Sequence, residues 1–83
     1  MSTKNIQLQK KLVMKLLKNK VLGSYHIRLE TMMHGFSRHE VGDLKRAAED
    51  LLKKGFLIWY SKSKKAIQLN KDKLDEIRTF LIE

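Results

Sequence analysis

The chain has no cysteine, no long apolar run and no glycine-rich loop among its 83 residues. Without cysteine it cannot form disulfides, thiolate zinc sites or cysteine nucleophiles, which favours an intracellular protein. The N-terminal segment lacks the apolar stretch and the small-residue cleavage site of a signal peptide, so a cytoplasmic location is expected. Charged residues make up 33% of the chain and interrupt every apolar stretch, so we predict no membrane span.

The residues that catalysis or metal binding requires are also missing as a set. His26, His34 and His39 have no carboxylate or cysteine at ligand spacing, and no nucleophile, base and orienting group can be assigned. A chain of this length forms one domain, residues 1–83, which buries about 60% of its unfolded surface. Such a domain has room for a core but not for an enclosed catalytic cavity. We therefore predict a non-enzymatic protein without metal, cofactor or small-molecule ligand.

Acidic residues are scarce in two parts of the chain. Lysine and arginine total 18 against 9 aspartates and glutamates, which gives a net charge of +9. No acid occurs before Glu30, and none lies between Lys53 and Lys71. Two basic zones thus flank a mixed middle, a pattern that favours a polyanionic partner such as nucleic acid over surface lysines kept for solubility.

A helix over residues 38–54 has a defined start and end. Ser37 and Glu40 have the spacing of a capping box, and Gly55 follows Lys53 and Lys54 at the position of a left-handed end residue. At 100° per residue, five apolar side chains share the inward face: Val41, Leu44, Ala48, Leu51 and Leu52. The outward face and its flanks carry His39, Gly42, Arg46, Asp50 and Lys53, with Arg38, Asp43, Lys45 and Glu49.

Gly42 is unusual on this helix, because an interior glycine costs about 1 kcal/mol relative to alanine. One interpretation is close approach of a partner to the backbone, and the other is tight packing against the preceding helix. The acids of the helix are expected to pair along it, as Asp43 with Arg46, Arg46 with Asp50, and Glu49 with Lys53.

Two helices precede this one. Residues 3–20 form the first, with Ile6, Val13, Leu16 and Leu17 inward, Leu12 at the margin, and the lysines 4, 11, 15 and 18 on the opposite face. Residues 24–27 favour a short strand, and residues 28–34 form a second helix that Gly35 ends. Phe36 is placed to act as a hydrophobic staple between the second and third helices.

After Gly55 the pattern predicts a β-hairpin with a basic tip. Pairing Leu57 with Leu69 and Trp59 with Ile67 places these four side chains on the core face. For Trp59 and Tyr60, a core or interface role is favoured over stacking on a base. The tip offers hydroxyls and cations to phosphates through Ser61, Lys62, Ser63, Lys64 and Lys65.

Asn70 caps a final helix that extends to about residue 82. Leu74, Ile77 and Leu81 form its inward stripe, whereas Phe80 and Ile82 are left over. Because a small monomer rarely exposes so much apolar surface, we predict a homodimer through this helix. The expected interface consists of Ile77, Phe80, Leu81 and Ile82.

These residues resemble a known family. Gly35-Phe36-Ser37, Val41, and Leu51 with Gly55-Phe56-Leu57 are similar to the GLS, V and LxxxGL signature of winged helix-turn-helix DNA-binding domains of small bacterial and archaeal regulators. The resemblance covers nearly the whole chain, and here the third helix is about one turn longer. It implies a mainly helical α+β fold with a three-helix core, a β-hairpin wing and a C-terminal helix.

The resemblance also implies a function. The chain would bind double-stranded DNA as a transcription regulator or architectural protein of the nucleoid, as a dimer on palindromic sites. The resemblance implies that base recognition belongs to Ser37, Arg38, His39, Lys45 and Arg46. The helical projection adds Gly42 to this DNA-binding set. The resemblance gives the role of the wing, contact with phosphates, to Lys62, Lys64 and Lys65. A protein-interaction module and an RNA-binding protein are the alternatives, because winged helices serve these roles too.

Overall fold

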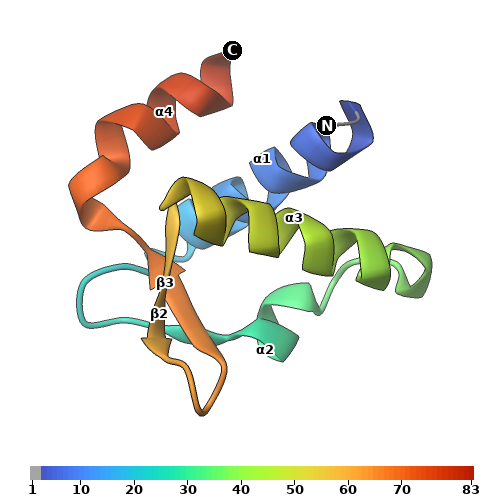
Figure 1. The fold of residues 1–83 in the computed structure, drawn as a ribbon, viewed down its shortest axis with the longest axis horizontal. Coiled ribbons are helices and arrows are strands. Elements are labelled where there is room, and N and C mark those ends of the chain that lie inside the picture. Colours follow the sequence, from blue (N-terminus) through green and yellow to red (C-terminus); the bar gives the residue numbers. More distant parts are fainter. Residues whose placement is uncertain (1–2) are drawn as a thin grey trace.

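Four α-helices and a three-stranded antiparallel sheet make up the described part of the chain, residues 3–83 of a computed structural model (Figure 1). The elements follow the order α1 (Thr3–Lys18), β1 (Ile27–Arg28), α2 (Leu29–Met33), the 3-10 turn η1 (Arg38–Glu40), α3 (Val41–Lys54), β2 (Leu57–Ser61), β3 (Ala66–Leu69), the 3-10 turn η2 (Lys71–Lys73) and α4 (Leu74–Ile82). The short strand begins at Ile27, so it lies at the end of the predicted segment.

The hairpin strand β3 lies at the centre of the sheet, in the order β1-β3-β2. The predicted pairs Leu57–Leu69 and Trp59–Ile67 are confirmed. Beyond them the register shifts by one residue, because Ser61 instead of Tyr60 pairs with Ala66. Tyr60 is therefore the extra residue of a β-bulge.

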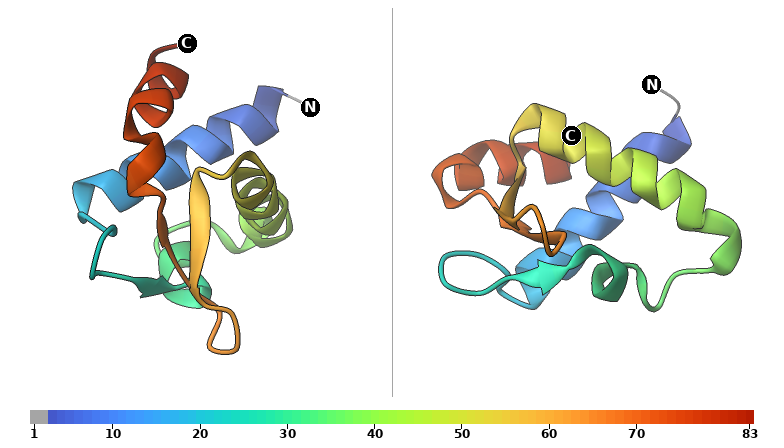
Figure 2. Two further views of the ribbon diagram at one scale, coloured as in Figure 1. Left: turned by 60° about the vertical axis from the view of Figure 1, so that its left-hand side comes forward. Right: turned by 60° about the horizontal axis from the view of Figure 1, so that its bottom comes forward.

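The core lies where α1 crosses α3 and both cover one face of the sheet (Figure 2). The buried face of α1 contains Leu8, Leu12, Val13 and Leu16, so the prediction of Leu12 as marginal is wrong. The reason is that α1 packs against α3, α4 and β3 together, which widens the arc of the helix that neighbours cover.

Both ends of α3 are fixed by local hydrogen bonds. The Ser37 hydroxyl accepts from the His39 N–H at 3.3 Å, whereas the Glu40 N–H bonds to the Ser37 carbonyl at 2.9 Å. Ser37 therefore caps the helical segment as predicted. Its hydroxyl, however, accepts from the His39 N–H and begins a 3-10 turn, so the predicted capping box is not formed. At the other end Gly55 has φ +81°, and the Phe56 N–H bonds back to the Leu51 carbonyl at 3.0 Å, which confirms the predicted end.

Of the core or interface role predicted for Trp59, the core role is wrong, because the residue is 37% exposed. Its neighbours on the same sheet face, Leu57 and Ile67, are 1% and 0% exposed. A bulge increases the local twist of a hairpin, and this one follows Trp59 directly. The hairpin beyond this point extends past the helices, as Figure 1 shows, so Trp59 lies at the border of the core.

Asn70 caps the C-terminal helical segment as predicted, since its side chain accepts from the Asp72 N–H at 3.1 Å. The expectation that Phe80 is left exposed is wrong. Its ring is 8% exposed and packs on Phe56 with a centroid separation of 5.5 Å, because α4 folds back over α1 and the start of β2. Ile77 is fully buried as well. Of the predicted interface, only Leu81, half-buried, and Ile82, 85% exposed, reach the surface.

Candidate nucleic-acid interface

All nine residues predicted to bind DNA are exposed: Ser37, Arg38, His39, Gly42, Lys45, Arg46, Lys62, Lys64 and Lys65. The first six lie on the turn before α3, on η1 and on the first turns of α3, and the three lysines lie at the hairpin tip. Leu44, Ala47, Ala48 and Leu51 hold the inward face of α3 in the core, which directs the opposite face outward. The helix pattern predicts Leu44, Ala48 and Leu51 on this face correctly, but it misses Ala47, and the predicted Val41 and Leu52 are only half-buried.

Gly42 faces open space. A Cβ atom built on this residue has no other heavy atom within 4 Å beyond its own helix. Tight packing against α2 therefore does not explain the glycine, and that interpretation is wrong. Close approach of a partner to the backbone at Gly42 stays a prediction.

An ion pair between helices replaces the pairs predicted along α3. The Lys4 ammonium lies 3.1 Å from the Asp43 carboxylate, so α1 neutralises the acid nearest the start of α3. Within residues 3–83, Arg46 forms no ion pair with Asp43 or Asp50, and Glu49 forms none with Lys53. Arg46 is exposed, and it lines a small hollow of about 70 Å³ with Lys4, Asn5 and Asp43.

Lys15 has a role that the sequence did not reveal. The sequence pattern puts Lys15 on the face of the first helix opposite the core. In the structure its ammonium donates to the carbonyls of Met32, at 2.8 Å, and His34. The same ammonium lies 5.1 Å from the centroid of the Phe36 ring. Lys15 therefore satisfies carbonyls at the end of α2 and fixes the turn from α2 to α3 onto α1.

The hairpin tip borders a hollow of about 440 Å³. Its lining consists of Arg28, Glu30, Ser63, Lys64 and Lys65. The tip is attached to the start of α2, because the Leu29 N–H donates to the Lys65 carbonyl at 2.9 Å. Arg28 was not predicted as a site residue, and only the position of β1 beside the hairpin reveals it.

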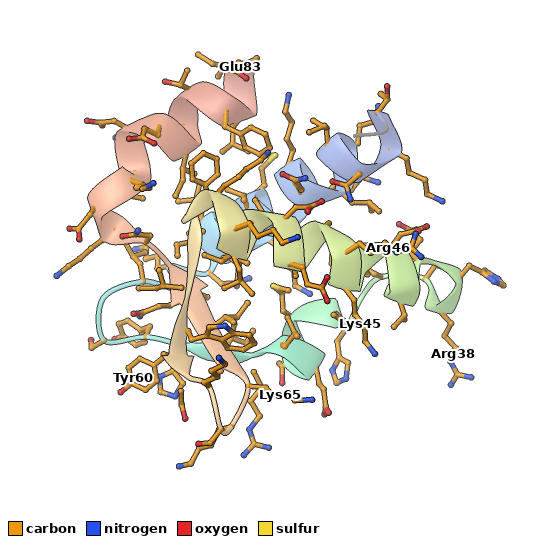
Figure 3. The ribbon with its side chains drawn as sticks, in the orientation of Figure 1. Arg38, Lys45, Arg46, Tyr60, Lys65 and Glu83 are labelled. Carbon is orange, nitrogen blue, oxygen red and sulfur yellow. The ribbon has the colours of Figure 1, made fainter. Side chains whose placement is uncertain are left out.

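A second hollow of about 500 Å³ lies between α2 and the start of α3. It is lined by Glu30, Met33, His34, Gly35, Phe36, Arg38, Val41 and Lys45. Glu30 lines both hollows, so the two hollows adjoin at this residue, one bordered by Arg38 and Lys45 and the other by Arg28, Lys64 and Lys65. In Figure 3, Arg38 from η1 and Lys45 from α3 extend on the side where the hairpin carries Lys65. We call the two adjoining hollows the concave face.

The described residues offer little for other kinds of site. Along residues 3–83, no three side chains of histidine, cysteine, aspartate or glutamate come together as a metal site would require. In the same part of the chain, no helix has the length and apolar character needed to cross a membrane. Comparison with known protein families, curated proteins and solved structures finds no match to this chain.

Proposed function

We propose that the chain binds double-stranded DNA as a winged helix-turn-helix protein, either as a transcription regulator or as an architectural protein of the nucleoid. The sheet order β1-β3-β2 and the succession of helix, strand, two helices and hairpin support this layout. The observation that carries the proposal is the concave face, where exposed cations of α3 and of the hairpin tip border adjoining hollows. A duplex presents phosphates on both sides of a groove, which matches two cationic borders.

In this proposal the start of α3 enters the major groove, which is wide enough for one helix. Arg38 extends from η1 and Arg46 from the second turn of α3, and arginine matches the two acceptors of guanine in that groove. Gly42 lies between them without a side chain, so the backbone approaches the base edges closely. Lys45 faces the second hollow and contacts the phosphate backbone.

The hairpin tip supplies affinity without sequence choice. Lys62, Lys64 and Lys65 are exposed, flexible cations, and lysine contacts phosphates as a point charge. The Lys65 carbonyl accepts a hydrogen bond from the N–H of Leu29, the first residue of α2. This bond attaches the tip to the helix that precedes α3. The cations near the start of α3 and those of the hairpin tip therefore contact the same duplex.

The experiment is a comparison of three alanine variants on duplexes chosen by selection from a random pool. Arg46→Ala is expected to relax base discrimination, whereas Lys64→Ala weakens all sequences alike. Lys11→Ala is the matched control, because Lys11 is an exposed lysine of α1 outside both hollows. Equal binding by the parent and all three variants would overturn the proposal.

A second copy of the chain is the partner we propose for the end of α4. Ile82 is 85% exposed there and Leu81 is half-buried, which leaves an apolar end on the helix. A two-fold dimer would present two copies of α3 to a palindromic site. Light scattering at high protein concentration tests this, and Ile82→Glu should convert a dimer to a monomer. A parent that is monomeric throughout would exclude the dimer.

A further inference from the structure

The aromatic residues are divided between the core and the exposed surface of the domain. All three phenylalanines pack against the core. The tyrosines and the tryptophan do not, since Tyr25 is 70%, Tyr60 51% and Trp59 37% exposed. Tyr25 precedes β1 by two residues, and the other two lie in β2, so the exposed rings gather around the sheet. Exposed rings on a strongly basic domain require an explanation other than packing.

The β-bulge determines where Tyr60 points. Strand alternation places Ile58 and Gln68 on the outer face of the sheet, opposite Leu57 and Ile67 in the core. Tyr60 shares this outer face and has no pairing partner on β3, because the register shift leaves it unmatched. Bulges commonly redirect a side chain next to a functional site. Figure 3 shows Tyr60 on the side of the hairpin away from α3 and Lys45.

The Tyr60 ring is held in a fixed orientation by His26. The two rings are stacked, with centroids 3.8 Å apart and planes inclined by 5°. His26 is kept in place because the buried Gln68 amide donates to the carbonyls of Gly23, at 2.7 Å, and Tyr25, at 2.9 Å. One face of the Tyr60 ring is therefore covered by His26, while the residue as a whole is still 51% exposed.

Cations outnumber acids at the end of the sheet where Tyr60 lies. Lys62 follows Tyr60 by two residues, and Lys64, Lys65 and Arg28 line the hollow at the same end of the sheet. Glu30 is the acid of that hollow. At the other end of the outer face, Asp72 and Lys71 line a hollow with Ile58 and Gln68, and their charges offset each other. An anion with flat apolar rings is complementary to this combination.

We propose that the outer face of the sheet is a second nucleic-acid site, which stacks an unpaired base on the free face of Tyr60 while tip lysines hold the adjacent phosphates. Base stacking on aromatic side chains combined with a cationic track is how proteins bind single strands without sequence preference. The ligand class is single-stranded nucleic acid, DNA or RNA. Tyr60 lies on the opposite side of the hairpin from α3, so stacking on its ring is separate from the α3 contacts of the duplex site, whereas the tip lysines are common to both sites.

The test compares Tyr60→Ala with Tyr60→Phe, which loses the hydroxyl but keeps the ring. The probes are fluorescein-labelled oligo(dT) and oligo(rU) of about fifteen nucleotides and a duplex of similar length. Tyr60→Ala is expected to weaken binding of a single strand by about tenfold, while Tyr60→Phe retains it and neither variant changes duplex binding. Weaker binding by Tyr60→Ala and unchanged binding by Tyr60→Phe, for either oligonucleotide, would support the proposed site.

Circular dichroism melting shows whether each variant is folded, and the parent supplies a measurement that needs no variant. Adding the oligonucleotide should shift the Tyr60 ring protons upfield in NMR spectra, because a stacked base shields them. Unchanged Tyr60 resonances at saturation would overturn the site, as would failure of the parent to bind a single strand. Equal loss of single-strand and duplex binding in Tyr60→Ala would also overturn it. A parent that binds single strands but no duplex would contradict the proposed function alone.

Discussion

Gly42→Ala should stabilise the protein and weaken its binding to duplex DNA. The added Cβ meets no atom within 4 Å, so it creates no clash in the folded chain. Replacing glycine in the first turn of α3 gains about 0.5–1 kcal/mol in the free energy of unfolding, because alanine has less backbone freedom to lose. For a domain of this size the gain raises the Tm by about 2–8 °C. The methyl group, however, stands where the proposed duplex approaches the backbone most closely.

Two assays on the same sample measure these opposite effects. Thermal unfolding by circular dichroism gives the Tm, and fluorescence anisotropy with a labelled duplex gives the Kd. Glu49→Ala is the control, since Glu49 is exposed on α3 away from its first turns and removing it should not weaken binding. A lower Tm for Gly42→Ala would refute the open-space argument. A higher Tm with an unchanged Kd would refute close approach of DNA at this position.

Three further substitutions test the packing and the charge of the site. Lys15→Met should lower the free energy of unfolding by about 1–2 kcal/mol in urea denaturation, because it removes two hydrogen bonds to carbonyls, whereas Lys18→Met on the exposed side of α1 should not. Equal effects would exclude the bridging role of Lys15. Phe80→Ala should cost about 3–4 kcal/mol without changing the molar mass in light scattering, and a stable variant with altered mass would place Phe80 in an interface. Glu30→Gln should tighten duplex binding about threefold at low salt, because it removes the acid shared by both hollows; weaker binding would exclude a duplex there.

The parts of the fold that the sequence predicts well are those set by neighbouring residues. Gly55 ends α3 because a left-handed residue closes a helix locally, and Asn70 caps through its own side chain. The pairing of Leu57 with Leu69 follows from strand alternation. In each case the determining atoms lie within a few residues or within one hairpin.

The parts that sequence reasoning missed depend on which distant element covers a surface. Periodicity places Phe80 beside the inward stripe of its helix, but only the return of α4 over Phe56 shows that it is buried. The spacing of Lys15 in the sequence predicts an exposed lysine. Only the folded structure shows that the end of α2 lies within hydrogen-bond distance of its ammonium. The bulge at Tyr60 shifts the pairing of β2 with β3 by one residue, and the alternation of side chains along a strand does not predict that shift.

For the candidate site, the sequence predicts which side chains are exposed but not how their charges are arranged. The cations at the start of α3 and in the hairpin were all identified from spacing and composition. The pairing of Asp43 with Lys4 was not, because it joins two helices far apart in the chain. The position of Glu30 between the two hollows likewise emerges only when α2 is placed beside the hairpin tip.

The salt dependence of duplex binding tests the central claim most directly. Five exposed cations line the two hollows of the concave face: Arg28, Arg38, Lys45, Lys64 and Lys65. If each neutralises one phosphate, the logarithm of the binding constant should fall against the logarithm of salt concentration with a slope of about −4.5. Lys64→Ala should reduce that slope by about one. Absence of duplex binding at low salt, or binding that does not change between about 50 and 200 mM salt, would contradict a DNA-binding function.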